Sequence, residues 1–292
     1  MSGALAGCRA IVTGGSRGLG LEIARAFWRE GASLVLVARE RAVLDESLAG
    51  LAGEGGDPAQ RVLALAADLA ETDAPDAIAA FAEDHLGGVD VLVNNAGLIG
   101  PIGKLAETDA TLWDRTLRVN LLAPVALCRR VVPAMVERGH GRIVNVSGGG
   151  ATTALPHFTA YATSKAGLVR FTESLARELD GTGVTVNALS PGALDTRLHA
   201  EVRAAGAALA GEAMYQTSLD VQRGRAAPIT RGAALAVFLA SAASAGVSGR
   251  LLSSIWDPWE RLPELAAELA PTDVFTLRRI TPKERGKDWE KP

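Results

Sequence analysis

Apolar residues in the first 255 positions fall into short, nearly continuous runs that alternate with longer amphipathic stretches. Val, Leu, Ile and Ala fill the runs, which is typical of strands covered on both faces. Between the runs, residues 19–30, 112–138 and 160–179 have apolar positions at helical spacing. Strand and helix in alternation predict a parallel sheet with helices on both faces. Seven strands are predicted, in the segments RAIVTGG, SLVLVA, RVLALAAD, VDVLVNNAG, GRIVNVSG, VTVNALSPG and GRLLSSIW.

The domain organisation follows from the absence of a linker rich in Pro, Ser or Gly in this part of the chain. We expect one domain over residues 1–255 and an appended segment over residues 256–292. Residues 193–228 interrupt the alternation and are rich in Ala and Gly, and we expect them to form a lid over the substrate. The appended segment holds three of the five tryptophans. It is expected either to fold over the pocket and influence substrate choice, or to serve as an interface or surface strap.

Composition narrows the class of protein. The chain has 292 residues, of which 48% are hydrophobic, so it can bury a large core. A net charge of −3 argues against a broad basic face for nucleic acid. Neither a secretory signal nor a run of eighteen apolar residues is found, so no membrane association is expected. Cys8 and Cys128 lie far apart and fit a reducing compartment, and the histidines lack metal-ligand spacing. We therefore expect a cytoplasmic protein without a metal.

A glycine-rich turn joins the first predicted strand to the first predicted helix. In IVTGGSRGLGLEIARAF, Gly14, Gly18 and Gly20 follow the pattern TGxxxGxG. Glycine permits positive φ and close approach of the backbone to a pyrophosphate, and the helix start offers free N–H groups to phosphate. An ordinary tight turn is the alternative. The interpretation as a dinucleotide loop adds Ser16 and Leu19 as contacts.

The segment YATSK places Tyr161 and Lys165 four residues apart, on one face of a helix. An ammonium ~4–5 Å from the phenol would favour the phenolate by on the order of two pKa units. Tyrosine would then serve as a general acid for reduction or a general base for oxidation. The alternative is a solvated surface pair.

Several short motifs occur together in one order. They are TGxxxGxG, NNAG at residues 94–97, Asn120, Ser147, Tyr161 with Lys165, and PG at residues 191–192. In this combination the chain resembles the short-chain dehydrogenase/reductase family over roughly residues 7–255. The resemblance implies an α/β fold with a doubly wound, Rossmann-type sheet of seven parallel strands, a nicotinamide cofactor, and a homotetramer or homodimer.

The resemblance also assigns roles around the tyrosine. Ser147 would donate a hydrogen bond to the carbonyl oxygen of the substrate, and Asn120 would join a water-linked relay to Lys165. Lys165 would also hold the ribose hydroxyls of the cofactor. Without the resemblance, Ser147 is a serine at a strand end, and Asn120 is a buried polar residue bonded to backbone.

The end of the second strand bears on the choice of nicotinamide cofactor. An acidic residue there would bind the ribose of NAD, whereas arginine would meet the extra phosphate of NADP. The sequence has Ala38 followed by Arg39, and Arg17 lies inside the glycine loop. Glu40 is the counter-argument, but we place it one step beyond the ribose, facing solvent. NADP(H) is predicted, with NAD(H) as the alternative.

The remaining cofactor contacts are carried over from the resemblance. They are Asp68 and Leu69 beside the adenine, Asn95, Ala96 and Gly97 along the backbone, and Pro191, Gly192 and Thr196 at the nicotinamide. Asp68 and Thr196 have an alternative role as helix caps.

These features predict an NADP(H)-dependent oxidoreductase that moves a hydride between nicotinamide and a small-molecule carbonyl or secondary alcohol. Two alternatives stay open. One is a dinucleotide-sensing protein with an unused site, and the other is an epimerase or dehydratase on the same scaffold.

Overall fold

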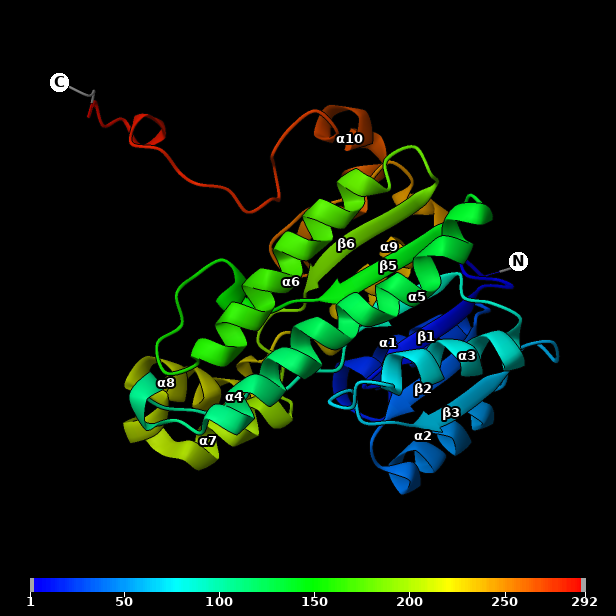
Figure 1. Cartoon of the computed structure of the whole chain (residues 1–292), viewed down its shortest axis with the longest axis horizontal. Coiled ribbons are helices and arrows are strands. Elements are labelled where there is room, and N and C mark those ends of the chain that lie inside the picture. The colour runs from blue at the N-terminus through cyan, green and yellow to red at the C-terminus, as the bar shows by residue number, and fades with distance from the viewer. Residues whose placement is uncertain (1–2, 290–292) are drawn as a thin grey trace.

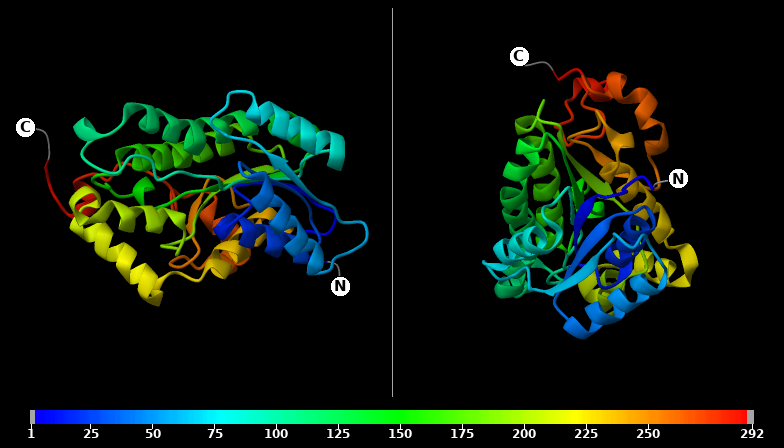
Figure 2. Two further views of the ribbon diagram at one scale, coloured as in Figure 1. Left: turned by 90° about the horizontal axis from the view of Figure 1, so that it is seen from below. Right: turned by 90° about the vertical axis from the view of Figure 1, so that its right-hand side faces the viewer.

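A computed structural model describes residues 3–289 and shows a seven-stranded parallel sheet between two helical layers (Figures 1 and 2). The strand order is β3-β2-β1-β4-β5-β6-β7, so the direction of winding reverses between β1 and β4. All seven predicted strands are confirmed. Their bounds are β1 (Arg9–Thr13), β2 (Ser33–Ala38), β3 (Val62–Ala66), β4 (Val91–Asn94), β5 (Gly141–Val146), β6 (Val184–Ser190) and β7 (Leu251–Ser253).

The helices divide between the two faces of the sheet because the strands present apolar side chains to both faces. In β1, Val12 belongs to one core cluster and Ile11 to the other, as the alternation of side chains along a strand requires. One face is covered by α1 (Gly18–Arg29), α2 (Arg41–Gly53), α9 (Ile229–Ala240) and α10 (Leu262–Leu269). The other is covered by α3 (Ala74–Leu86), α5 (Ala123–Glu137) and α6 (Thr159–Glu178).

The helix predicted at residues 112–138 is present but is not uniform. It consists of α4 (Ala110–Leu117), a π-helical turn (Arg118–Leu122) and α5. The π turn contains Asn120, and such turns inside α-helices are frequent at functional sites.

This same helical run is the one segment of residues 3–289 that is long and apolar enough to cross a membrane. It has 28 residues, Ala110–Glu137, with a mean hydropathy of 1.5 in its most apolar window. Several of its apolar side chains, including Leu127, Cys128 and Met135, are fully buried against the sheet. Packing inside the domain therefore accounts for its composition.

The irregular stretch at residues 193–228 folds into α7 (Arg197–Ala210), α8 (Glu212–Asp220) and a π turn (Val221–Arg225). Figure 1 shows α7 and α8 beyond the carboxyl ends of the strands. Gly206 and Gly211 adopt φ values of 75° and 78°, which break the helical run in two places. The Ala and Gly content that obscured the helical period in the sequence thus supplies the bends.

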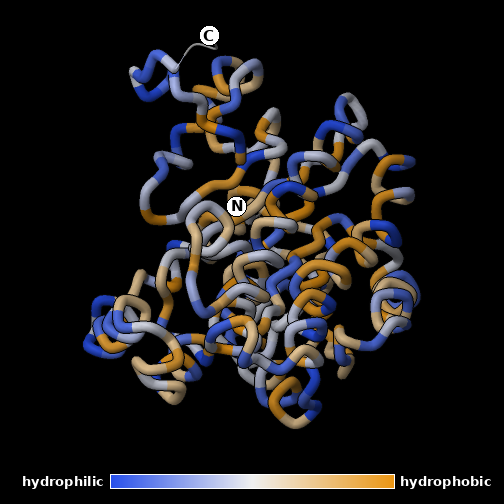
Figure 3. The backbone as a smooth tube through the Cα atoms, turned by 60° about the vertical axis from the view of Figure 1, so that its left-hand side comes forward, coloured by the Kyte–Doolittle hydropathy of each residue, from blue (hydrophilic) through white to orange (hydrophobic). Residues whose placement is uncertain are grey.

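The segment after β7 packs on its own chain. Trp259, Leu262 and Leu269 belong to the same core cluster as α1 and α9. The buried Arg250 guanidinium donates to four carbonyl groups at the end of α10 and beyond it, those of Leu269, Ala270, Thr272 and Val274. Residues 278–289 are mostly exposed, and Figure 1 shows this end of the chain, in red, extending away from the body. Figure 3 shows that the end of the chain is mostly hydrophilic. Up to residue 277, the appended segment is a strap.

The strap also closes the outer edge of β7, the last strand of the sheet. The Leu251 N–H donates to the Phe275 carbonyl at 2.8 Å, and the Ser253 N–H to the Asp257 carboxylate at 2.7 Å. An open edge strand invites pairing with another chain, so these bonds protect the sheet.

Candidate active site

The candidate site lies at the carboxyl ends of β1, β4, β5 and β6, where the reversal of strand order opens a crevice. A hydroxyl group ties two of these ends together. Thr13 Oγ1, at the end of β1, accepts from the backbone N–H groups of Asn95 at 3.0 Å and Ala96 at 3.1 Å. The Asn95 side-chain amide donates in return to the Thr13 carbonyl at 2.8 Å. The two walls of the crevice are therefore fixed relative to each other.

Tyr161 and Lys165 lie together on the first turns of α6, as predicted. Lys165 Nζ is 5.9 Å from the centroid of the Tyr161 ring. The lysine is only 4% exposed and donates a hydrogen bond to the Val146 carbonyl at 2.7 Å, at the end of β5. The alternative of a solvated surface pair is thereby excluded.

The electrostatics of the pair differ from the sequence-based expectation. Burial raises the pKa of Tyr161 to about 12, and burial lowers the pKa of Lys165 to about 8. The predicted lowering of the tyrosine pKa is wrong for this structure, because burial removes the hydration that would stabilise the phenolate. At neutral pH the phenol is therefore protonated and suited to donate a proton.

Ser147 directly follows β5 and presents an unused hydroxyl. Its N–H donates to the Leu189 carbonyl at 2.7 Å, which holds the backbone in the sheet. Its Oγ is buried and has no hydrogen-bond partner among residues 3–289. The next residue, Gly148, has its Cβ position 2.2 Å from the Tyr161 hydroxyl. Buried polar atoms usually have a partner, so the unpartnered Ser147 hydroxyl suits a group brought by a ligand.

Asn120 is fully buried in the π turn, and its amide is engaged locally. It accepts from the Leu98 N–H at 2.8 Å and donates to the Leu98 carbonyl at 2.8 Å and to Ser164 Oγ at 3.0 Å. A Cβ built on Gly97 would lie 3.5 Å from both Asn120 Oδ1 and Lys165 Nζ, so the two side chains face the same small space. These contacts match the alternative of a buried polar residue. The relay to Lys165 stays a prediction.

The glycine loop has the conformation that the motif requires. Gly14 and Gly18 adopt φ values of 65° and 55°. A Cβ on Gly20 would lie 2.2 Å from the Gly14 carbonyl oxygen, so α1 can pack this closely on the loop only with glycine there. The helix begins at Gly18, and no side chain caps its first N–H groups. They are available to a phosphate.

Two of the predicted contacts bury their side chains in the core, and a third uses its backbone carbonyl in a local bond. Leu19 and Leu69 are each 6% exposed and pack in the two core clusters. Ser16 is 7% exposed, and its carbonyl accepts from Ser47 Oγ at 3.0 Å. At Leu19 and Leu69 only the backbone is left to meet a cofactor.

The charged residues expected at the adenosine end are on the surface. Arg17 pairs with Glu40 at 3.0 Å, and both side chains are about half exposed. Glu40 is exposed, as predicted, but it binds the loop arginine. Arg39 is exposed and has no ion pair within the described part of the chain. Of the two arginines, Arg39 is therefore the one whose guanidinium is not already held in an ion pair.

Asp68 has a partner that sequence reasoning missed. Its carboxylate accepts from the Ala70 N–H at 2.9 Å and from Arg115 Nη2 at 2.6 Å. Burial alone would raise the pKa of Asp68, but these two donors and nearby Arg39 hold it below its usual value. Asp68 stabilises the turn that contains Ala70 and does not cap α3, which begins six residues later at Ala74.

The nicotinamide end of the crevice is formed after β6. Pro191 is buried, and Gly192 has a φ of 80° with the Ile255 side chain 3.0 Å from where its Cβ would be. Thr196 precedes α7 without making a capping bond, and its methyl group is 3.6 Å from the Cβ position of Gly18. The cap alternative is not realised, and Thr196 lies across the crevice from the glycine loop.

An amide network beneath the site braces neighbouring elements. Asn94 donates to Asn145 Oδ1 at 2.8 Å, and Asn145 donates to Thr172 Oγ1 on α6 at 2.8 Å. The Thr172 hydroxyl donates to the Leu168 carbonyl at 2.8 Å. Helix α6 is therefore linked to β5 and β4 by hydrogen bonds between side chains. Sequence reasoning found Asn94 through the NNAG motif, but no local signal marked the other two.

The wall beside Tyr161 is apolar, as the composition of the lid predicted. Ile99 and Phe158 form a cluster in which Tyr161 packs together with Leu198 and Met214 of the lid helices. The candidate substrate space therefore has hydroxyl groups on one side and hydrocarbon on the other.

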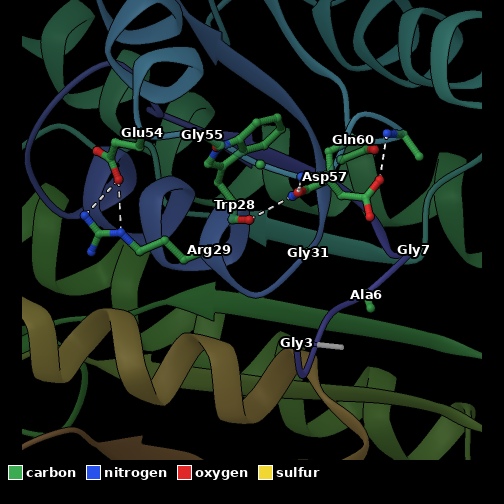
Figure 4. A pocket seen from close by; sticks show the side chains of 13 residues that line it. Gly3, Ala6, Gly7, Trp28, Arg29, Gly31, Glu54, Gly55, Asp57 and Gln60 are labelled. Carbon is green, nitrogen blue, oxygen red and sulfur yellow. Dashed lines mark hydrogen bonds and ion pairs between the residues drawn. The ribbon is translucent and has the colours of Figure 1, made fainter. Parts of the chain in front are cut away.

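A cavity of about 530 Å³ lies at the opposite end of the sheet, where β1 and β2 begin (Figure 4). Its polar side chains bond within the protein. Arg29 pairs with Glu54, and the Gln60 amide donates to the Trp28 and Ala32 carbonyls. Nothing in it connects with Tyr161, and we assign it no role.

Comparisons with known proteins agree with this geometry. The model of the short chain dehydrogenase family matches residues 9–207. A short chain dehydrogenase of Pseudocercospora fijiensis is 43% identical over 200 residues, which span 68% of this chain and 63% of that protein. Galactitol 2-dehydrogenase (L-tagatose-forming) of Cereibacter sphaeroides is 38% identical over 252 residues, 85% of this chain and 94% of that protein. A solved variant of actinorhodin polyketide ketoreductase with NADPH has a TM-score of 0.77 at 33% identity and covers 87% of this chain and 97% of that one.

Proposed function

The chain belongs to the short-chain dehydrogenase family, and from that premise we propose that it is an NADP(H)-dependent oxidoreductase interconverting a carbonyl and a secondary alcohol in a small molecule. The observation that carries the proposal is that Tyr161 and Lys165 both lie against the chain on either side of the unpartnered Ser147. Lys165 donates to the Val146 carbonyl, and the Tyr161 hydroxyl is 2.2 Å from the Cβ position of Gly148.

Each of these side chains has a role in the reduction. A bound nicotinamide supplies the hydride, which the protein cannot provide itself. The Ser147 hydroxyl donates a hydrogen bond to the substrate oxygen as negative charge develops there. Tyr161, protonated because burial raises its pKa to about 12, transfers its proton to that oxygen. Lys165 fixes the end of β5 against α6 through the Val146 carbonyl and keeps positive charge near the phenol.

The same pKa predicts how alcohol oxidation depends on pH. Oxidation of an alcohol requires Tyr161 to act as a base, and below pH 12 most of the phenol is protonated. The rate of alcohol oxidation should therefore rise with pH, as a larger fraction of Tyr161 is ionised.

The glycine loop and the start of α1 fit the pyrophosphate of a dinucleotide, because no side chain caps the first N–H groups of α1. Apart from its chain neighbours, the atom nearest to a Cβ built on Gly18 is the Thr196 methyl group, at 3.6 Å. We assign the 2′-phosphate of NADP to Arg39 and Arg17. The unpaired state of Arg39 supports this, and the similar ketoreductase structure was solved with NADPH. Titration with NADPH and NADH tests the assignment, and equal affinities would contradict it. Arg39→Asp should shift the preference toward NADH.

A carbonyl panel monitored by loss of NADPH absorbance tests the reaction itself. Tyr161→Phe should abolish turnover while NADPH still binds. Tyr215→Phe, which changes the one other tyrosine of the chain, is the matched control and should retain activity. A wild-type protein that binds NADPH without turning over any carbonyl would favour the dinucleotide-sensing alternative. Product formation without net NADPH consumption would favour the epimerase or dehydratase alternative.

We also propose that the protein works in the cytoplasm as a homodimer or homotetramer. Light scattering on the purified full chain measures the assembly, and a monomeric mass would contradict this part of the proposal.

A further inference from the structure

Three glycines follow Ser147 and lead into α6 through a short 3₁₀ turn, Gly149–Ala151. Such a run is usually taken for a flexible loop. None of the three has a positive φ, and Gly148 is extended at −172°. Backbone freedom therefore does not explain the glycines, and the explanation lies in what surrounds them.

The space around the three positions differs sharply. A Cβ on Gly148 would lie 2.2 Å from the Tyr161 hydroxyl and 3.2 Å from its ring carbon Cζ. A Cβ on Gly150 would lie 2.9 Å from the backbone Cα of Ala162. A Cβ on Gly149, between them, would meet nothing within 4 Å. The first and third glycines are thus packed against the first turn of α6, and the second is open.

We infer that Gly148 and Gly150 are positioning residues, whose missing side chains let the end of β5 pack against the turn that carries Tyr161 and so set its hydroxyl beside Ser147. This inference rests on the proposed function, since it deepens the assignment of Tyr161 as the proton donor. Neither glycine touches substrate. Each acts by fixing where the hydroxyl stands.

The distances around Gly148 show how far an alanine there would displace the Tyr161 hydroxyl. Ordinary contact with a Cβ begins at 3.4 Å, so an alanine at position 148 moves the hydroxyl by at least about 1 Å. The Tyr161 ring packs among Ile99 and Phe158, so this shift cannot be absorbed by free rotation. A misplacement of about 1 Å at a reacting group costs on the order of a hundredfold in rate.

The experiment compares Gly148→Ala and Gly150→Ala with Gly149→Ala as the matched control, using a carbonyl substrate that the wild type reduces. For Gly148→Ala we expect kcat to fall on the order of a hundredfold, with KM and the Kd for NADPH unchanged within about threefold. For Gly150→Ala we also expect kcat to fall while KM and the Kd for NADPH stay unchanged. The solvent deuterium isotope effect on kcat should rise in both, because the proton is transferred from a displaced donor. Gly149→Ala should match the wild type.

Two results would overturn the inference. One is equal kcat in the Gly148→Ala and Gly149→Ala proteins. The other is a loss of kcat at Gly148→Ala matched by weakened NADPH binding and an unchanged isotope effect, which would indicate general distortion of the fold.

A double-mutant cycle on protein stability tests the contact between Gly148 and the Tyr161 hydroxyl without an activity measurement. Gly148→Ala should destabilise the wild type more than it destabilises Tyr161→Phe, because phenylalanine lacks the clashing oxygen. Equal destabilisation in both backgrounds would overturn the inference even if a variant is too unstable to assay. A wild type without turnover would instead overturn the proposed function, while the cycle would still report whether Gly148 and Tyr161 contact each other.

Discussion

Replacement of Lys165 by methionine should make the cofactor-free protein more stable while removing its activity. The lysine is buried, and burial lowers the pKa of its amine from an ordinary 10.5 to about 8. Holding the amine protonated in the folded state at pH 7 therefore costs about 3 kcal/mol relative to the unfolded chain. Methionine removes this cost and leaves the Val146 carbonyl without its donor, a loss of about 1–3 kcal/mol. The expected net gain at pH 7 is about 1 kcal/mol.

The pH dependence of this gain is the sharper part of the prediction. Between the folded and unfolded pKa values of Lys165, from about 8 to 10.5, the unfolded chain binds more protons than the folded one. The cost of keeping the buried Lys165 amine protonated destabilises the wild type below pH 8, and this cost diminishes as pH rises toward 10.5. The advantage of Lys165→Met should shrink by about 1.4 kcal/mol between pH 7 and pH 9. The Tyr161 phenol is common to both proteins and cancels from the comparison.

Urea unfolding of both proteins at pH 7 and pH 9 measures these differences. Lys104→Met is the matched control, because the Lys104 side chain is 74% exposed, and its effect should stay within about 0.5 kcal/mol at both pH values. A difference between the wild type and Lys165→Met that does not change with pH would refute the reasoning, since it would show that burial does not perturb the amine.

Three further outcomes are expected. Asn145→Ala leaves the buried Asn94 amide with only the long contact to Cys128 Sγ and removes the donor to Thr172, so the free energy of unfolding in urea should fall by about 2–4 kcal/mol, and a fall under about 0.5 kcal/mol would show that the network is dispensable. Deletion of residues 278–292 should leave kcat and KM unchanged, because the strap ends before them; an altered KM would revive the hypothesis that this end of the chain selects the substrate. Glu40→Gln frees Arg17 from its ion pair, so fluorescence titration should show NADPH binding up to about fivefold tighter with NADH unaffected, and unchanged NADPH binding would remove Arg17 from the phosphate site.

The elements that could be predicted are those whose signal is local. A buried parallel strand is built around a short, nearly continuous apolar run, and all seven strands of this chain contain such a run. Tyr161 and Lys165 are four residues apart, and any helix brings such positions to one face. The glycine loop is equally local, since Gly14 and Gly18 take positive φ within a single turn.

The pairings within the site could not be predicted, because their partners are distant in sequence. Asp68 and Arg115 are 47 residues apart, and Asn94 and Asn145 are 51 apart. Such pairs are created by the packing of strands and helices in the folded chain, and no spacing in the sequence records that packing. The same holds for Arg250, whose guanidinium meets carbonyl groups of a segment that sequence analysis treated as an appendage.

The amino-acid sequence by itself determined the layered α/β architecture, the glycine loop and the chemistry of the reacting side chains. Only the tertiary structure decided how those side chains titrate and what limits their position. Loss of hydration depends on every neighbour at once, so the raised pKa of Tyr161 became evident only with its surroundings in place. Likewise, the sequence gives Gly148 no role beyond that of a loop residue. The structure shows that a Cβ at this position would lie 2.2 Å from the Tyr161 hydroxyl.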